Sequence, residues 1–174
     1  MTAKRLPLIG LVTGLVFFLI DQFVKYLVVG PLGLSFEGDR RELLPIFALN
    51  FVKNQGVSLG FLRADSDAMR WALVALTAAI AIGVLVWMWR ETNRQDQFAL
   101  GMVLGGAAGN ILDRVRLGYV VDFADLHFGD FRPFLVFNVA DAAITIGVLV
   151  LLVRALLVRD KPRAERASVE NTHA

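Results

Sequence analysis

Residues 71–89 read WALVALTAAIAIGVLVWMW, an uncharged stretch of 19 residues. A helix needs about 20 predominantly apolar residues to cross the hydrocarbon core of a bilayer. Tryptophans stand at both ends of this stretch, Trp71 at one end and Trp87 and Trp89 at the other, as is typical of side chains that anchor a span at the membrane interface. The stretch therefore predicts a membrane-spanning helix near residues 69–90.

Three further apolar stretches lie elsewhere in the chain. Residues 134–153 hold a single charge, Asp141, while residues 98–112 and 6–20 are uncharged. We expect these stretches to form three more helices, near 6–29, 98–116 and 134–157. The predicted fold class is an all-α membrane protein with four transmembrane helices.

The first apolar stretch also has a feature of a signal peptide, because Lys4 and Arg5 precede it. However, Asp21, Gln22 and Lys25 stand where the small residues of a cleavage site would be expected. We therefore expect this stretch to be retained as a helix.

Composition excludes several kinds of chemistry. The chain has 174 residues, of which 56% are hydrophobic and 20% charged, too apolar for the surface of a soluble globule. It has no cysteine and two histidines, which rules out a cysteine nucleophile, a disulfide and a thiolate metal site and is too few for a multi-histidine site. We expect no metal, no cofactor and no nucleic-acid partner.

The segment 31–66 differs from the other connections. Residues 46–52 mix β-branched and aromatic side chains, residues 57–61 are similar, and an Asn-Gln-Gly turn signal at 54–56 separates them. We expect a small β-element here, between the first and second helices. The polar residues 160–174 lack apolar periodicity and are expected to be a disordered tail after a single domain, 1–159.

The distribution of charge indicates an orientation only weakly. Lys and Arg favour the cytoplasmic side, but the two termini and the 90–97 loop together hold nine of the 18 basic residues, so this count decides nothing. Acidic residues accompany the bases of the opposite side, whereas the C-terminal end is net basic. This favours both termini in the cytoplasm, with residues 31–66 and 117–133 facing outward.

Glycines recur every four residues in the third predicted helix, at Gly101, Gly105 and Gly109. Small residues at this spacing let two helix backbones approach closely. We expect packing within the bundle, with a dimer interface as the alternative.

Polar residues interrupt the apolar stretches at a few positions. An ionisable group in hydrocarbon costs at least ~2.5–3.5 kcal/mol, so it usually has a partner or a function. Asp21 and Lys25 are one helical turn apart and therefore share a face. A local ion pair and a role in supporting a site are equally consistent with this spacing.

The other polar residues gather around the junction of the third and fourth helices, where one helix ends and the next begins on the same side of the membrane. They are Asn110, Asp113, Arg114, Asp122, Asn138 and Asp141. Asp122 lies within an apolar, strand-like stretch, whereas Asp125 and Asp130 resemble ordinary loop acids.

Two neighbouring carboxylates share one proton, because both cannot easily ionise together. The ionised group can then deprotonate a water molecule while the protonated group polarises a carbonyl, as in aspartic proteases. Buried acids also mark the pathways of proton-coupled or ion-coupled transporters. From the residues alone, a carboxylate-pair hydrolase and a small transporter subunit both stay open.

Five motifs in order make the sequence resemble the bacterial lipoprotein signal peptidase family (signal peptidase II) over about residues 10–157. They are Asp21-Gln22 with Lys25; Asn54-Gln55-Gly56; Gly109-Asn110-Ile111-Leu112-Asp113-Arg114; Val120-Val121-Asp122-Phe123; and Phe137-Asn138-Val139-Ala140-Asp141. The resemblance implies an aspartic endopeptidase that removes the signal peptide of diacylglyceryl-modified prolipoproteins, cutting before the lipidated cysteine.

By the same resemblance, Asp122 and Asp141 are the catalytic residues. Residues matching the substrate-binding positions are Asn54, Asn110, Arg114 and Asn138, and those with a site-supporting role are Asp21, Lys25, Gly56, Asp113 and Ala140. The resemblance further implies inhibition by globomycin, contact with membrane lipids, a monomer, and a place in the bacterial inner membrane with both termini in the cytoplasm and the active site near the extracytoplasmic face, beside the β-element.

Overall fold

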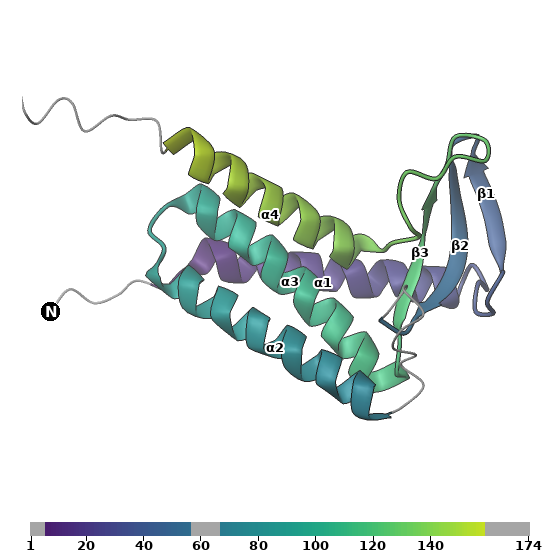
Figure 1. The fold of residues 1–174 in the computed structure, drawn as a ribbon, viewed down its shortest axis with the longest axis horizontal. Coiled ribbons are helices and arrows are strands. Elements are labelled where there is room, and N and C mark those ends of the chain that lie inside the picture. Colours follow the sequence, from purple (N-terminus) through teal and green to yellow (C-terminus); the bar gives the residue numbers. More distant parts are fainter. Residues whose placement is uncertain (1–5, 57–66, 159–174) are drawn as a thin grey trace, which may run out of the picture.

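The computed structural model describes residues 6–56 and 67–158. Four helices run alongside one another in this part of the chain, and a small sheet lies at one end of them (Figure 1). The helices are α1 (Leu8–Val29), α2 (Asp67–Arg90), α3 (Arg94–Leu117) and α4 (Val139–Val158), and the strands are β1 (Arg40–Leu44), β2 (Phe47–Asn54) and β3 (Val120–Leu126). The predicted helices are thus confirmed as elements.

Among the described residues, three helices are long and apolar enough to cross a membrane, namely α1, α2 and α4. Helix α3 has the length, but its first turn is polar and its last turns carry Asp113, Arg114 and Arg116. A crossing by α3 therefore stays a prediction. It is supported by position, because α3 packs against each of the other three helices.

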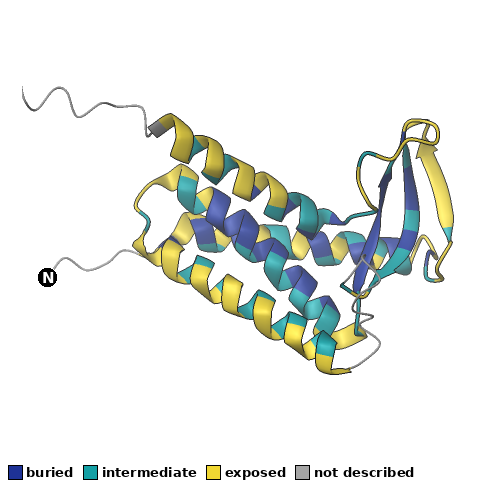
Figure 2. Cartoon of the chain, viewed as in Figure 1, coloured by how far each residue is buried: buried dark blue, intermediate teal, exposed yellow. Residues whose placement is uncertain are grey.

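The outer faces of the bundle are apolar and exposed (Figure 2). Leu76 and Ile82 of α2 and Leu152 of α4 are each more than half exposed. A soluble monomer rarely exposes such extended apolar surface. These faces are suited to contact with lipid tails, whereas the residues of α3 are largely buried between the other helices.

The glycines of α3 pack against α1. A Cβ atom at Gly101 would collide with the Gly10 carbonyl oxygen, and one at Gly105 with that of Gly14. The expected close packing within the bundle is therefore confirmed.

The sheet is antiparallel with the order β1-β2-β3. Strands β1 and β2 lie between α1 and α2, where the β-element is predicted, and the third strand, β3, lies between α3 and α4 and pairs with β2. Strand β3 is buried on both faces, so it requires a neighbouring strand to satisfy its backbone groups. The strand predicted at 57–61 lies outside the described residues.

Two helix boundaries differ from the prediction because of local hydrogen bonds. Helix α4 begins at Val139 rather than near 134, because the Phe137 N–H and carbonyl are both paired with Ala124 and hold the chain extended. Helix α3 begins at Arg94 rather than 98. The Asn93 side chain accepts hydrogen bonds from the first turn, which caps the helix earlier than its polar sequence indicates.

Candidate active site

Asp122 lies in the middle of β3 and is 1% exposed. Its Oδ2 atom accepts a hydrogen bond from Asn54 Nδ2 at 2.8 Å, and its Oδ1 atom accepts one from Asn138 Nδ2 at 2.6 Å. Because side chains alternate along a strand, Asp122 faces away from Val121 and Phe123, which belong to the apolar cluster of the sheet. The strand thus presents this carboxylate to the start of α4.

Asp141 lies in the first turn of α4 and exchanges two hydrogen bonds with Asn138. The Asn138 Oδ1 atom accepts from the Asp141 N–H at 2.9 Å, and Asp141 Oδ2 accepts from the Asn138 N–H at 3.2 Å. This is the geometry of a capping box, with asparagine and aspartate in its two positions. Asp141 Oδ1 also accepts from Asn110 Nδ2 at 2.8 Å, which ties the carboxylate to α3.

Asn138 therefore contacts both predicted catalytic carboxylates. Its side-chain amide donates to Asp122 and also to Asn110 Oδ1, at 3.2 Å, while its backbone N–H and Oδ1 engage Asp141. The pKa of Asp122 is raised from 3.8 to about 6, first by burial and then by the charge of Asp141. Hydrogen bonds from Asn54 and Asn138 oppose this rise in pKa. Asp122 thus holds a proton more readily than an ordinary aspartate.

A buried charge cluster supports the pair from α1. Lys25 Nζ lies 2.8 Å from Asp21 Oδ2 and 2.8 Å from Asp113 Oδ2, and all three residues are no more than 5% exposed. The same ammonium donates to Asn110 Oδ1 at 3.3 Å. Lys25 therefore pairs with Asp113 as well as with Asp21. It also holds the Oδ1 atom of Asn110, whose Nδ2 atom donates to Asp141.

The two acids of this cluster also hold backbone N–H groups on both sides of the site. Asp21 Oδ1 accepts from the Ala140 N–H at 2.9 Å, in the first turn of α4. Asp113 Oδ2 accepts from the Val121 N–H at 3.2 Å, next to Asp122 in sequence. A carboxylate at a helix N-terminus is favoured by the orphan N–H groups and the helix dipole. The cluster therefore positions the start of α4 and the centre of β3 together.

Gln22 takes part in this cluster, although the sequence analysis assigned it no role in the site. Its Nε2 atom donates to Asp21 Oδ2 and to Asp113 Oδ1, each at 3.1 Å. The signal that could have identified it is its place one helical turn before Lys25, because residues three apart share a helix face.

Gly56 and Arg114 border the site at the end of β2. The Gly56 N–H donates to Asn54 Oδ1 at 2.9 Å, which leaves the amide nitrogen of Asn54 for Asp122. Gly56 has a φ of 106°, a conformation that favours glycine. The Arg114 Nε atom is buried and has no hydrogen-bond partner among the described residues, while its backbone carbonyl accepts from Arg70 Nε at 2.7 Å.

Asp125 is not the ordinary loop acid that the sequence indicated. It lies in β3, is 1% exposed, and pairs with Arg40 Nη1 at 3.3 Å and Arg132 Nε at 3.2 Å. The prediction failed because β3 extends to Leu126 and is covered on both faces. Asp130 is exposed, as expected.

A cavity of about 420 Å³ opens beside Asp122, between the end of β2 and the segment before α4. Asn54 and Gly56 line it together with Leu135 and Val136. Among the residues that the structure describes, no group of three or more His, Asp or Glu side chains is placed to hold a metal ion. The chemistry that the arrangement offers is proton transfer by two carboxylates whose positions are set by amides.

The family described as Signal peptidase (SPase) II matches residues 13–157. The chain belongs to this family. Its members are peptidases of the membrane that remove signal peptides from prolipoproteins, so the predicted resemblance and the prediction of a membrane protein are confirmed.

Curated relatives and solved structures agree with this assignment. A lipoprotein signal peptidase of Rhizorhabdus wittichii is 54% identical over 162 residues, 93% of each chain. One of Sphingopyxis alaskensis is 52% identical over 163 residues, 92% of this chain and 94% of the relative. A solved structure of a bacterial membrane enzyme has a TM-score of 0.77 at 26% identity, covering 94% of this chain and 97% of that one.

Proposed function

We propose that the protein is an aspartic endopeptidase of the membrane, which cleaves diacylglyceryl-modified prolipoproteins before the lipidated cysteine. The observation that carries this proposal is the double contact of Asn138, whose backbone engages Asp141 and whose side chain engages Asp122. Membership of the signal peptidase II family supports the substrate class. In this proposal Asp122 and Asp141 are the catalytic pair.

The reaction runs on one proton shared between the two carboxyl groups. The ionised member takes a proton from a water molecule, whose oxygen attacks the carbonyl carbon of the scissile peptide. The protonated member gives its proton to the carbonyl oxygen. When the tetrahedral intermediate collapses, the C–N bond breaks and the proton taken from water passes to the leaving amine, while one hydroxyl of the intermediate returns its proton to the carboxylate that had protonated the carbonyl oxygen. The raised pKa of Asp122 favours it as the protonated member, although the pair titrates as one unit.

The three site asparagines have a double role in this proposal. Their amide N–H groups hold the carboxylates in the free enzyme, and when substrate binds these amides exchange part of their hydrogen bonds for contacts to the substrate backbone, together with the Arg114 guanidinium. Holding the peptide in this way turns a substrate that diffuses in the membrane into one with a positioned scissile bond. The lipid tails of the substrate lie between the helices.

The proposed setting is the bacterial inner membrane. Residues 1–159 form one domain, both termini are cytoplasmic, and the sheet and the carboxylates lie near the extracytoplasmic face. The protein works as a monomer without cofactor or metal, and globomycin-like peptides bind at the same carboxylates.

The alternative function, that of a proton-coupled or ion-coupled transporter subunit, is not supported by the family match. It would also need acids spread through the bundle, whereas Asp113, Asp122 and Asp141 gather at the sheet end of it.

The decisive experiment measures cleavage of a diacylglyceryl-modified prolipoprotein by Asp122→Asn and Asp141→Asn variants in detergent. Each substitution keeps the shape of the side chain but removes its acid–base function, so we expect cleavage to fall by at least about 10³-fold. Asp130→Asn is the matched control, because Asp130 is exposed and lies in the loop after β3. Cleavage at the normal rate by either active-site variant would overturn the assignment of the pair.

A further inference from the structure

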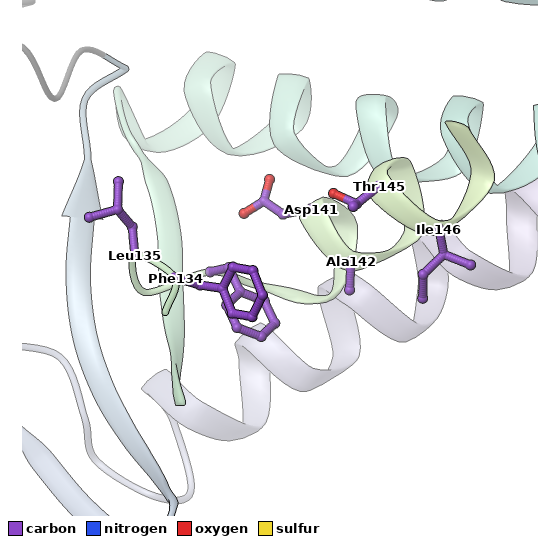
Figure 3. A pocket seen from close by; sticks show the side chains of 7 residues that line it. Phe134, Leu135, Asp141, Ala142, Thr145 and Ile146 are labelled. Carbon is purple, nitrogen blue, oxygen red and sulfur yellow. The ribbon is translucent and has the colours of Figure 1, made fainter. Parts of the chain in front are cut away.

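A second cavity, of about 240 Å³, begins at Asp141 and follows α4 away from the sheet. Figure 3 shows Asp141, Ala142, Thr145 and Ile146 in succession along the first turns of this helix, with Asp141 nearest the sheet. Ala142 and Thr145 line the cavity with short side chains next to the Asp141 carboxylate.

The other wall of this cavity belongs to the segment between β3 and α4. Phe134, Leu135 and Phe137 line it and give it an apolar surface. Leu135 also lines the larger cavity beside Asp122. The two cavities therefore adjoin at Leu135, with one carboxylate in each.

The direction of the α4 cavity decides which part of a substrate reaches it. It extends from Asp141 along an apolar helix that is long enough to cross the membrane. A signal peptide has an apolar central region that ends shortly before its cleavage site, and this region stays in the membrane. The α4 cavity therefore faces the signal-peptide side of the bond to be cut, while the cavity beside Asp122 opens under the sheet.

The dimensions of the α4 cavity fit one amino-acid side chain better than a lipid tail. From Asp141 to Ile146 the helix rises only about 7.5 Å, much less than the length of a long acyl chain. Cavities that hold whole small-molecule ligands usually measure about 300–1,000 Å³, and this one is smaller. The aromatic and aliphatic lining suits a branched apolar side chain.

We propose that the α4 cavity is a specificity subsite that receives one apolar side chain of the signal peptide close to the scissile bond. Ile146 closes its far end and limits the size of that side chain. This inference rests on the proposed function, because it presupposes that Asp141 acts on a signal peptide. It adds a determinant of substrate choice that the carboxylates do not provide.

The test compares Ile146→Ala with Val148→Ala. Both residues are β-branched, lie on α4 and are half exposed, 50% and 49%, but only Ile146 lines the cavity. The substrates are diacylglyceryl-modified prolipoproteins in which each residue of the stretch before the cut is changed in turn to Ala, Leu or Trp. A third variant, Thr145→Leu, fills the cavity instead of enlarging it.

At one substrate position we expect Trp to lower kcat/KM of the unchanged enzyme by at least about 10-fold, because pockets discriminate by about 10–200-fold for a change of one methylene. Ile146→Ala should recover much of the kcat/KM for the Trp substrate, whereas Val148→Ala should not. The Thr145→Leu variant should have a lower kcat/KM for the substrate with Leu at that position and a higher one for the substrate with Ala there.

Two results would overturn the subsite. One is a substrate profile of Ile146→Ala that matches that of Val148→Ala at every position. The other is a response of Ile146→Ala and Thr145→Leu to the length of the acyl chains, tested with substrates of one peptide sequence and different acyl chains, because the occupant would then be lipid. If the unchanged enzyme cleaves no diacylated substrate, it is the proposed function that fails.

Discussion

Asn138 and Asp141 hold each other at the start of α4 through two reciprocal hydrogen bonds, Asn138 Oδ1 to the Asp141 N–H at 2.9 Å and Asp141 Oδ2 to the Asn138 N–H at 3.2 Å. One motif thus caps a helix and orients a proposed catalytic carboxylate. The Asn138 amide nitrogen adds the contact to Asp122, at 2.6 Å. Stability and activity are therefore linked through this side chain, but they depend on different atoms of it.

Substitution of Asn138 separates these two roles. Asn138→Ala removes the cap and should lower the free energy of unfolding by about 0.5–2 kcal/mol. Asn138→Ser keeps an oxygen that can accept from the Asp141 N–H, and serine caps helices about as well as asparagine. It lacks the N–H that reaches Asp122. We expect both variants to lose about 100-fold or more in kcat. Both lose the hydrogen bonds from the amide nitrogen, but only Asn138→Ala also loses the cap, so it should be the less stable of the two in thermal unfolding in detergent. An active Asn138→Ser variant would show that the contact to Asp122 is dispensable.

The pKa of Asp122 predicts a pH dependence of stability. Burial and the charge of Asp141 raise this pKa from 3.8 to about 6, so the native state binds the proton more tightly than the unfolded state. The stabilisation is complete below pH 3.8 and is lost as pH rises to about 6, by about 3 kcal/mol. Asp122→Asn does not titrate, so the free energy of unfolding should fall less across this window than in the unchanged protein.

Asp141→Asn provides the matched comparison for this titration. This substitution removes the charge of residue 141, which contributes to the raised pKa of Asp122, but leaves the burial of Asp122 in place. The pH dependence of its free energy of unfolding should therefore lie between those of the unchanged protein and of Asp122→Asn. Stability profiles that are identical in all three proteins between pH 4 and 6 would contradict a raised pKa of Asp122.

Removal of the Lys25 ammonium should be strongly destabilising. Lys25→Met leaves Asp21 and Asp113 buried without their cation, and breaking such a buried pair costs about 3–5 kcal/mol. Adding Asp113→Asn to this variant should recover part of the loss, because one uncompensated charge disappears. Lys53→Met is the control, since Lys53 lies over the Tyr119 ring, a contact worth about 0.5–1 kcal/mol. Equal losses of unfolding free energy in the two single variants would contradict the supporting role of the cluster.

The contact of α1 with α3 makes a prediction about glycine. Gly105→Ala brings a Cβ atom against the Gly14 backbone, so the helices must separate and the protein should unfold at lower temperature. Gly83→Ala in α2 meets nothing within 4 Å and should be neutral or stabilising by up to about 1 kcal/mol, from helix propensity alone. A Gly105→Ala protein as stable as Gly83→Ala would show that α1 and α3 do not depend on this approach.

The sequence alone determined the helical elements. Apolar length defined the four helices to within five residues at each end, because the cost of burying polar groups in lipid restricts where a span can begin and end. Polar residues in apolar surroundings predicted a site that includes Asp122 and Asp141, since such residues are costly without a partner or a function. Helical spacing placed Asp21 with Lys25 on one face. These inferences depend on neighbours along the chain, which a sequence displays directly.

Only the tertiary structure decided which residues meet across the chain. Pairing of β2 with β3 joins segments 66 residues or more apart, and it brings Asn54 to Asp122. The second partner of Lys25, the buried position of Asp125 and the place of Gln22 depend in the same way on contacts between separate elements. So does the cavity beside Asp141, whose walls come from α4 and from the segment before it. Local periodicity carries no information on these contacts, because long-range pairing is set by how whole faces pack together.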